Sequence, residues 1–96
     1  MNFFFSDEPR IQTEPWSITT KTGANINFHC TGAPVVEYTW YKNGSRVSSK
    51  NDLFVSSFGT LSVNNVKKSD DGVYVCVAKS KKSFAVATVS LNVGRK

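Results

Sequence analysis

The sequence predicts a single all-β domain in which two sheets pack face to face. Its 96 residues allow one domain and leave no room for a cofactor-binding fold with a separate substrate domain. Apolar side chains nowhere recur at helical spacing over a helix-length segment, whereas alternation with a period of two recurs along the chain. Turn residues separate the alternating runs at intervals of roughly 8–12 residues, which is typical of sandwiches. We therefore expect seven to eight short strands.

The predicted strands follow from local patterns, in chain order. The first segment, 9–20, contains Pro9 and Pro15. Because proline removes a ladder donor, we expect this segment at a sheet edge. The remaining strands are predicted at 24–31, 36–42, 46–49, 52–56, 60–64, 72–79 and 83–93. Inward faces are clearest in the sets Ile26, Phe28 and Cys30; Tyr38 and Trp40; and Val89, Leu91 and Val93. The turns are marked by Thr22-Gly23, Gly32-Ala33-Pro34, Asn43-Gly44, Phe58-Gly59 and Ser69-Asp70-Asp71-Gly72.

Both ends of the chain are expected to lie outside the domain. We predict a disordered extension over 1–8, the domain over 9–94 and a frayed end over 95–96. The apolar run Phe3–Phe5 is too short for the core of a signal peptide, so we expect a piece cut from a larger protein, beginning at an added Met1. No stretch of 18 apolar residues is present, so direct membrane insertion by this segment is excluded.

The residue inventory argues against catalysis and against a metal site. His29 is the only histidine, and two cysteines with one histidine cannot complete a zinc set. Asp70 and Asp71 are adjacent on an extended chain and so point apart, which does not make a general acid and base pair. The sequence contains no Gly-rich phosphate loop and no nucleophile elbow. We therefore predict a binding or spacing module without enzymatic activity or cofactor.

The most specific pattern combines Cys30, Trp40 and the run Asp70-Asp71-Gly72-Val73-Tyr74-Val75-Cys76. A sandwich explains the spacing if the cysteines face each other from opposite sheets with Trp40 packed on the sulfurs. Tyr74, two residues before the second cysteine, would then turn its hydroxyl back to the backbone as a tyrosine corner. Over residues 9–93 this pattern resembles an immunoglobulin domain.

The resemblance implies an immunoglobulin-like β-sandwich of two antiparallel sheets with Greek-key connections. It implies a Cys30–Cys76 disulfide and a core signature of Trp40, Leu61, Asp70, Gly72 and Tyr74, with the Tyr74 hydroxyl bonded near Lys68 to Asp70. Only about 21 residues separate Trp40 from Leu61, as in the I-set rather than the variable class.

Two positions depart from the I-set pattern. Where an arginine often opens strand D and pairs with an aspartate matching Asp70, this chain has Asp52. Lys50 is the substitute partner, or the ion pair is absent. The turn after the second cysteine reads Lys79-Ser80-Lys81-Lys82-Ser83 instead of an Asn-x-x-Gly turn.

Two features bear on the cellular compartment. A Cys30–Cys76 disulfide would persist only in an oxidising compartment. The alternative is two reduced, buried cysteines, as in the intracellular immunoglobulin domains of muscle proteins. Asn43-Gly44-Ser45 is an N-glycosylation acceptor, and it also supplies the Asn-Gly that a tight hairpin turn requires. Asn43 is therefore a candidate glycosylation site, and turn chemistry alone is the alternative.

The chain carries a formal net charge of +5. In the resembled fold one pole would collect Lys21, Lys42, Arg46, Lys67 and Lys68, and the other Lys79, Lys81 and Lys82. The last three are candidate residues for binding an anionic partner such as heparan sulfate or an acidic protein face. The alternative is a solvated surface that keeps the domain soluble. Nucleic acid is not expected as a partner, because Trp40 and Phe28 belong to the core and leave no aromatic platform.

These features predict a non-catalytic extracellular recognition or adhesion module of a cell-surface receptor or matrix protein, with protein partners. One alternative is a structural immunoglobulin domain of a titin-like cytoplasmic muscle protein. Another is a matrix module that binds heparan sulfate.

Overall fold

The structure is a computed structural model that describes residues 10–34 and 37–94. The predicted extension 1–8 and the predicted frayed end 95–96 lie outside the described residues. The elements are β1 (Arg10–Glu14), β2 (Ser17–Lys21), β3 (Ile26–Ala33), β4 (Glu37–Lys42), β5 (Ser45–Arg46), β6 (Leu53–Val55), β7 (Thr60–Val63), the 3₁₀ turn η1 (Lys68–Asp70), β8 (Gly72–Lys79) and β9 (Phe84–Gly94). None of the described residues belongs to a helix with the length and apolar character needed to cross a membrane.

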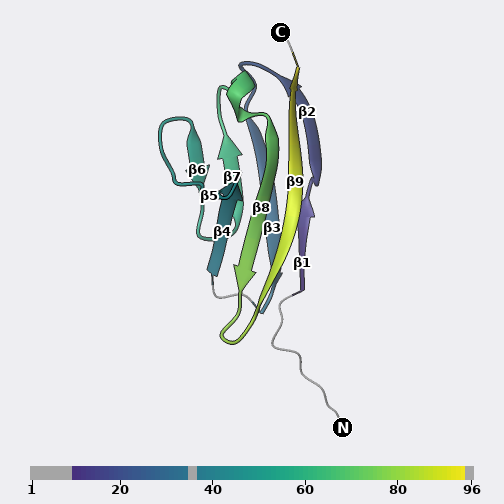
Figure 1. The fold of residues 1–96 in the computed structure, drawn as a ribbon, viewed down its shortest axis with the longest axis vertical. Coiled ribbons are helices and arrows are strands. Elements are labelled where there is room, and N and C mark those ends of the chain that lie inside the picture. The colour runs from purple at the N-terminus through teal and green to yellow at the C-terminus, as the bar shows by residue number, and fades with distance from the viewer. Residues whose placement is uncertain (1–9, 35–36, 95–96) are drawn as a thin grey trace.

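The strands form two sheets that pack face to face (Figure 1). The four-stranded sheet has the order β1-β3-β7-β6, and the five-stranded sheet has the order β2-β9-β8-β4-β5. The predicted all-β sandwich is therefore confirmed. The turn at 80–83 joins β8 to β9 at one end of the sandwich, which we call the hairpin pole, and η1 lies at the other end (Figure 1).

The N-terminal segment differs from the prediction in two respects. It contains two strands instead of one, because the chain leaves β1 at Pro15 and Trp16 and crosses to the other sheet, so the described residues hold nine strands rather than seven to eight. Both strands lie at sheet edges, as the two prolines predict. At this edge β2 pairs with β9 in parallel, whereas the other paired strands of both sheets are antiparallel.

The strand predicted at 46–49 is shorter than expected. Asn43 and Gly44 both have positive φ, 53° and 81°, and close a two-residue hairpin in which Lys42 lies opposite Ser45. After Arg46 only the Val47 N–H still donates to β4, at the Trp40 carbonyl oxygen (2.8 Å). The chain then leaves the sheet, so β5 keeps only two residues.

The core lies between the two sheets. Its largest buried side chains are Trp40, Tyr74, Phe28, Leu61 and Leu91. Cys30 and Cys76 are completely buried and are joined by a disulfide with their Cα atoms 6.6 Å apart. The bond closes a loop of 46 residues, which corresponds to about 4 kcal/mol in the chain-entropy model. The disulfide implied by the resemblance is therefore present.

Candidate recognition surfaces

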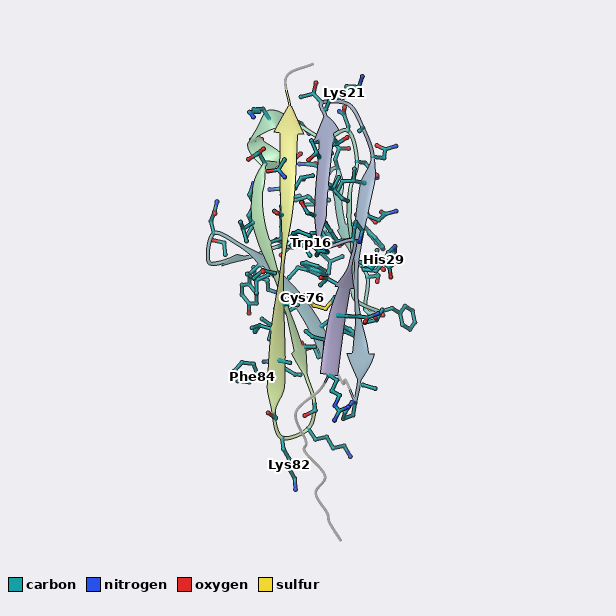
Figure 2. All side chains as sticks on the ribbon, turned by 90° about the vertical axis from the view of Figure 1, so that its right-hand side faces the viewer. Trp16, Lys21, His29, Cys76, Lys82 and Phe84 are labelled. Carbon is teal, nitrogen blue, oxygen red and sulfur yellow. A yellow bond between two sulfur atoms is a disulfide. The ribbon has the colours of Figure 1, made fainter. Side chains whose placement is uncertain are left out.

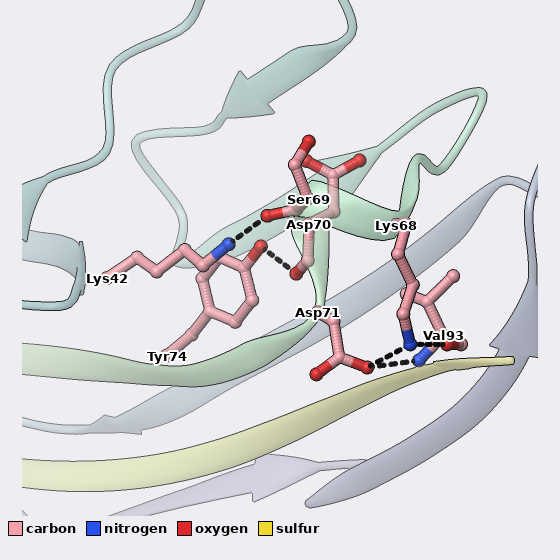
Figure 3. A network of polar contacts seen from close by, with 7 residues as sticks. All are labelled: Lys42, Lys68, Ser69, Asp70, Asp71, Tyr74 and Val93. Atoms are coloured by element: carbon pink, nitrogen blue, oxygen red, sulfur yellow. Dashed lines mark hydrogen bonds and ion pairs between the residues drawn. The ribbon is translucent and has the colours of Figure 1, made fainter.

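Tyr74 anchors the turn between β7 and β8. Its hydroxyl donates to the Asp70 carbonyl oxygen at 2.6 Å, within the stretch that the resemblance implies (Figure 3). Burial, reinforced by the carboxylates of Asp70 and Asp71, raises the pKa of Tyr74 to about 12. The hydroxyl therefore keeps its proton, and keeps donating, throughout the physiological range. Lys42 covers the same ring, with Nζ 5.3 Å from the ring centroid, and donates to the Ser69 carbonyl oxygen at 2.6 Å.

The two adjacent aspartates have separate structural partners. Asp70 Oδ2 accepts the backbone N–H of Lys67 at 2.8 Å and so caps η1. Asp71 Oδ2 accepts the backbone N–H of Val93 at 2.6 Å and lies 3.9 Å from Lys68 Nζ (Figure 3). Both acids therefore hold the β7–β8 turn in place. Among the described residues, no cluster of three or more histidine, cysteine or acidic side chains is placed to bind a metal ion.

The ion pair expected at the start of β6 is rearranged. Asp52 stands at the arginine position of the I-set pattern and pairs with Lys67, Nζ to Oδ2 3.1 Å. Within the described ranges no ion pair joins Lys50 to Asp70. The ion pair with Asp70 is therefore absent from the described residues, and the Asp52–Lys67 pair links the residue before β6 to the residue before η1 instead.

Gly59 connects several parts of the core through its backbone, although the sequence indicates it only as a turn residue. Its carbonyl oxygen accepts both the Cys30 backbone N–H at 3.0 Å and the Trp40 indole N–H at 3.1 Å. Its φ is +98°, and a Cβ atom at this position would overlap the Cys30 carbonyl oxygen. The residue therefore links the disulfide strand to the core tryptophan, and its backbone conformation favours glycine.

The basic residues of the two poles differ in their partners. At the η1 pole Lys42, Lys67 and Lys68 are engaged, the last donating to the Val93 carbonyl oxygen at 2.6 Å, whereas the described part of the chain gives the side chains of Lys21 and Arg46 no ion pair or hydrogen bond. At the hairpin pole no ion pair or hydrogen bond engages the side chains of Lys79, Lys81 and Lys82 within residues 10–34 and 37–94. Figure 2 shows Lys82 at the tip of the hairpin, far from Lys21 at the other end.

The hairpin that carries these lysines is fixed by its own hydrogen bonds. The Ser80 N–H donates to the Ser83 carbonyl oxygen at 2.8 Å, and the Ser83 N–H donates to Ser80 Oγ at 3.1 Å. Arg10, at the start of β1, lies at the same pole, because it is paired with Ala33 at the end of β3. Sequence reasoning did not assign Arg10, since only the sheet register brings it to this end.

Asn43 and His29 are both exposed, in different settings. Asn43 occupies the hairpin turn between β4 and β5, so its side chain is open to modification. His29 Nδ1 lies 3.0 Å from Thr60 Oγ1 on the outer face of the four-stranded sheet. His29 is thus a surface residue of β3 with a side-chain contact to β7.

The two outer faces of the sandwich differ in polarity. The four-stranded sheet turns polar side chains of β3 and β7 outward, namely Asn27, His29, Thr31, Thr60 and Ser62, and it also exposes Phe54 of β6 (55%), which lies opposite Ser62. The five-stranded sheet instead exposes Val73, Phe84 and Val86, with exposed fractions of 53%, 59% and 55%. Figure 2 shows Phe84 and His29 projecting from opposite sides. The sequence prediction missed this apolar face, although β8 reads as an unbroken apolar run over 73–78.

Comparisons with known proteins agree with this structure. A family model described as "Immunoglobulin domain" matches residues 8–80. Protein turtle homolog B of Rattus norvegicus is 38% identical over 82 residues, which cover 83% of this chain and 6% of that protein. Peroxidasin homolog of Mus musculus is 36% identical over 78 residues, covering 77% of this chain and 5% of that protein. Protein sax-3 of Caenorhabditis elegans is 32% identical over 97 residues, covering 92% and 8%. The chain therefore spans only a small part of each relative.

Solved structures show the same fold. The crystal structure of the titin M10–obscurin-like 1 Ig complex matches with a TM-score of 0.81 and 25% identity, covering 92% of this chain and 95% of that one. The N-terminal four Ig domains of Dscam1 isoform 9.44 match with a TM-score of 0.73 and 27% identity, covering 90% and 21%. Together with the disulfide and the sandwich topology, these similarities show that the chain belongs to the immunoglobulin domain family.

Proposed function

We propose that this chain is a non-catalytic recognition or adhesion module of a larger extracellular protein, a cell-surface receptor or a matrix protein, and that its partners are proteins. The observation that carries the proposal is the exposed apolar outer face of the five-stranded sheet. Single exposed apolar residues are ordinary on protein surfaces, but a contiguous group on one sheet face is typical of an interaction site. Matches to turtle homolog B, sax-3 and Dscam1 favour such a role.

The extracellular location is supported by two features of the chain. The Cys30–Cys76 disulfide is typical of an oxidising compartment, and the exposed Asn43-Gly44-Ser45 turn is open to N-glycosylation. The short β5 and β6 also favour assignment to the I-set. The alternative, a domain of a cytoplasmic muscle protein, is favoured by the similarity to titin. Titration of free thiols in the natural protein, unfolded without reductant, distinguishes them: we expect none, and two would favour the muscle alternative.

A second candidate function is binding of heparan sulfate at the hairpin pole. Lys79, Lys81 and Lys82 have no intramolecular partner in the described part of the chain, whereas Lys42, Lys67 and Lys68 near η1 are engaged. Binding of an anion by these lysines would therefore break no hydrogen bond or ion pair within the described part of the chain. Such binding would weaken as salt shortens the Debye length below about 10 Å.

Replacing Lys79, Lys81 and Lys82 by serine tests this candidate. We expect the variant to elute from immobilised heparin at clearly lower salt than the parent, with an almost unchanged melting temperature, because exposed charges contribute little to stability. The control replaces Lys21, Arg46 and Lys50 by serine and so has the same net charge. Equal losses in both variants, or equal shifts on a plain cation exchanger, would show that only total charge matters.

A further inference from the structure

The outer face of the five-stranded sheet carries three aligned rows of side chains. The register places Thr39, Val77 and Val86 side by side in a middle row. On the side toward the hairpin pole, the next outward row is Glu37, Lys79 and Phe84. On the side toward η1, the next outward row is Arg46, Tyr41, Val75 and Thr88. The middle row is uncharged; Thr39 within it is only 7% exposed, and Val86 is 55% exposed.

Two charged side chains on this face, Glu37 and Arg46, are placed so that they complement each other, and Lys79 adds a base to the Glu37 row. Glu37 lies two residues before Thr39 on β4, and Arg46 lies opposite Tyr41, two residues after Thr39. Both charged side chains are exposed and line the same open hollow of about 480 Å³ at the β4 edge. No ion pair joins them within the described chain. The acid lies on one side of the central row and the base on the other. When the face meets the same face of a second copy with the strands reversed in direction, the acid of each copy lies over the base of the other.

From this arrangement we propose that the face docks against the same face of a second copy of this chain. The two-fold axis would run along the middle row, across the strands, so that Val77 and Val86 meet their counterparts. The Glu37 row of each copy would then lie on the Arg46 row of the other, which forms two symmetry-related Glu37–Arg46 contacts. Such an isologous pairing is the usual symmetry of homodimers. The inference rests on the proposed function, because it names the partner of the recognition surface.

The size of the face suits a weak dimer. Four strands at about 4.8 Å spacing and eight residues of β8 at about 3.3 Å each give a sheet face of roughly 500 Å². A standard interface buries roughly 800 Å² on each partner, so this face belongs to the small end of the range. We therefore expect a dissociation constant between about 10 µM and 1 mM, which many tethered copies would convert into firm adhesion.

Sedimentation of the unglycosylated 96-residue chain at increasing concentration, up to about 1 mM, tests the proposal. Glu37→Arg and Arg46→Glu each place like charges against each other twice in the dimer, so each is expected to weaken association at least about tenfold. The double variant carrying both changes restores the opposite charges and is expected to return to within about threefold of the parent. Arg10→Glu and Glu14→Arg, exposed charge reversals on β1 in the other sheet, are the matched controls and should leave association unchanged.

Each outcome decides the question. Rescue by the double variant, together with unchanged controls, supports self-docking through this face. A parent chain that remains monomeric up to about 1 mM overturns it, as do single variants that dimerise like the parent or a double variant that stays as weak as the singles. Circular dichroism melting of every variant separates lost association from lost folding. None of these results alters the thiol titration, so self-docking can fail while the proposed recognition function stands.

Discussion

Trp40→Ala is expected to lower the free energy of unfolding by about 3–5 kcal/mol, enough to unfold a marginal domain. The indole is completely buried, packs against the Phe28 ring at a centroid distance of 6.4 Å, and donates its N–H to the Gly59 carbonyl oxygen. Its removal leaves a cavity in the core and one unsatisfied acceptor position. Urea unfolding followed by circular dichroism measures the loss.

The chain supplies its own control for this variant. Trp16, between β1 and β2, is 72% exposed, so Trp16→Ala should change the free energy of unfolding by less than about 1 kcal/mol. If the two variants unfold at the same urea concentration, Trp40 is not the centre of the core.

Gly59→Ala is the second substitution with a large expected effect, about 3–4 kcal/mol of lost stability. The added methyl group meets the Cys30 carbonyl oxygen, and alanine is strained at a φ of +98°. Relief of the overlap would displace the Gly59 carbonyl oxygen from its two donors, on Cys30 and Trp40. The change is therefore expected to disturb the disulfide region and the tryptophan together.

Gly44→Ala separates steric overlap from backbone strain. Gly44 has a similar φ of +81°, but a Cβ atom there would meet nothing within 4 Å. This control should lose only about 1 kcal/mol, from strain alone. Thermal unfolding of both variants measures the difference, and equal losses would contradict the steric overlap between a Cβ atom at position 59 and the Cys30 carbonyl oxygen.

Local patterns were sufficient to predict most strands and the core motif. Alternation around Phe28 and Cys30 specifies which side chains point inward, and the spacing from Cys30 to Cys76 implied the disulfide through the resemblance. Sheet pairing is less visible, because it depends on contacts between segments far apart in the sequence. The crossing at Pro15 and the parallel β2–β9 pair therefore required the structure.

The recognition surfaces were harder to predict than the fold. The run Val73 to Ala78 is apolar on both faces of β8, and such a run also fits a strand covered on both sides. The sequence does not reveal which face another layer covers. The same limit applies to the lysines. Nothing in the sequence distinguishes Lys42 from Lys79, whereas the structure gives Lys42 a hydrogen bond and an aromatic contact and gives Lys79 neither among the described residues.

The central claim, an extracellular disulfide-linked recognition module, is tested most directly by a non-reducing peptide map of the protein isolated from its natural source. One unreduced digest of protein unfolded in the presence of excess alkylating reagent, which reaches the buried cysteines only on unfolding, reports both the Cys30–Cys76 linkage and the occupancy of Asn43. We predict that the two cysteine peptides are recovered as one linked species and that Asn43 carries a glycan, since both modifications arise in the secretory pathway. Two separately recovered, reduced cysteine peptides together with an unmodified Asn43 would contradict the claim and favour a cytoplasmic structural domain.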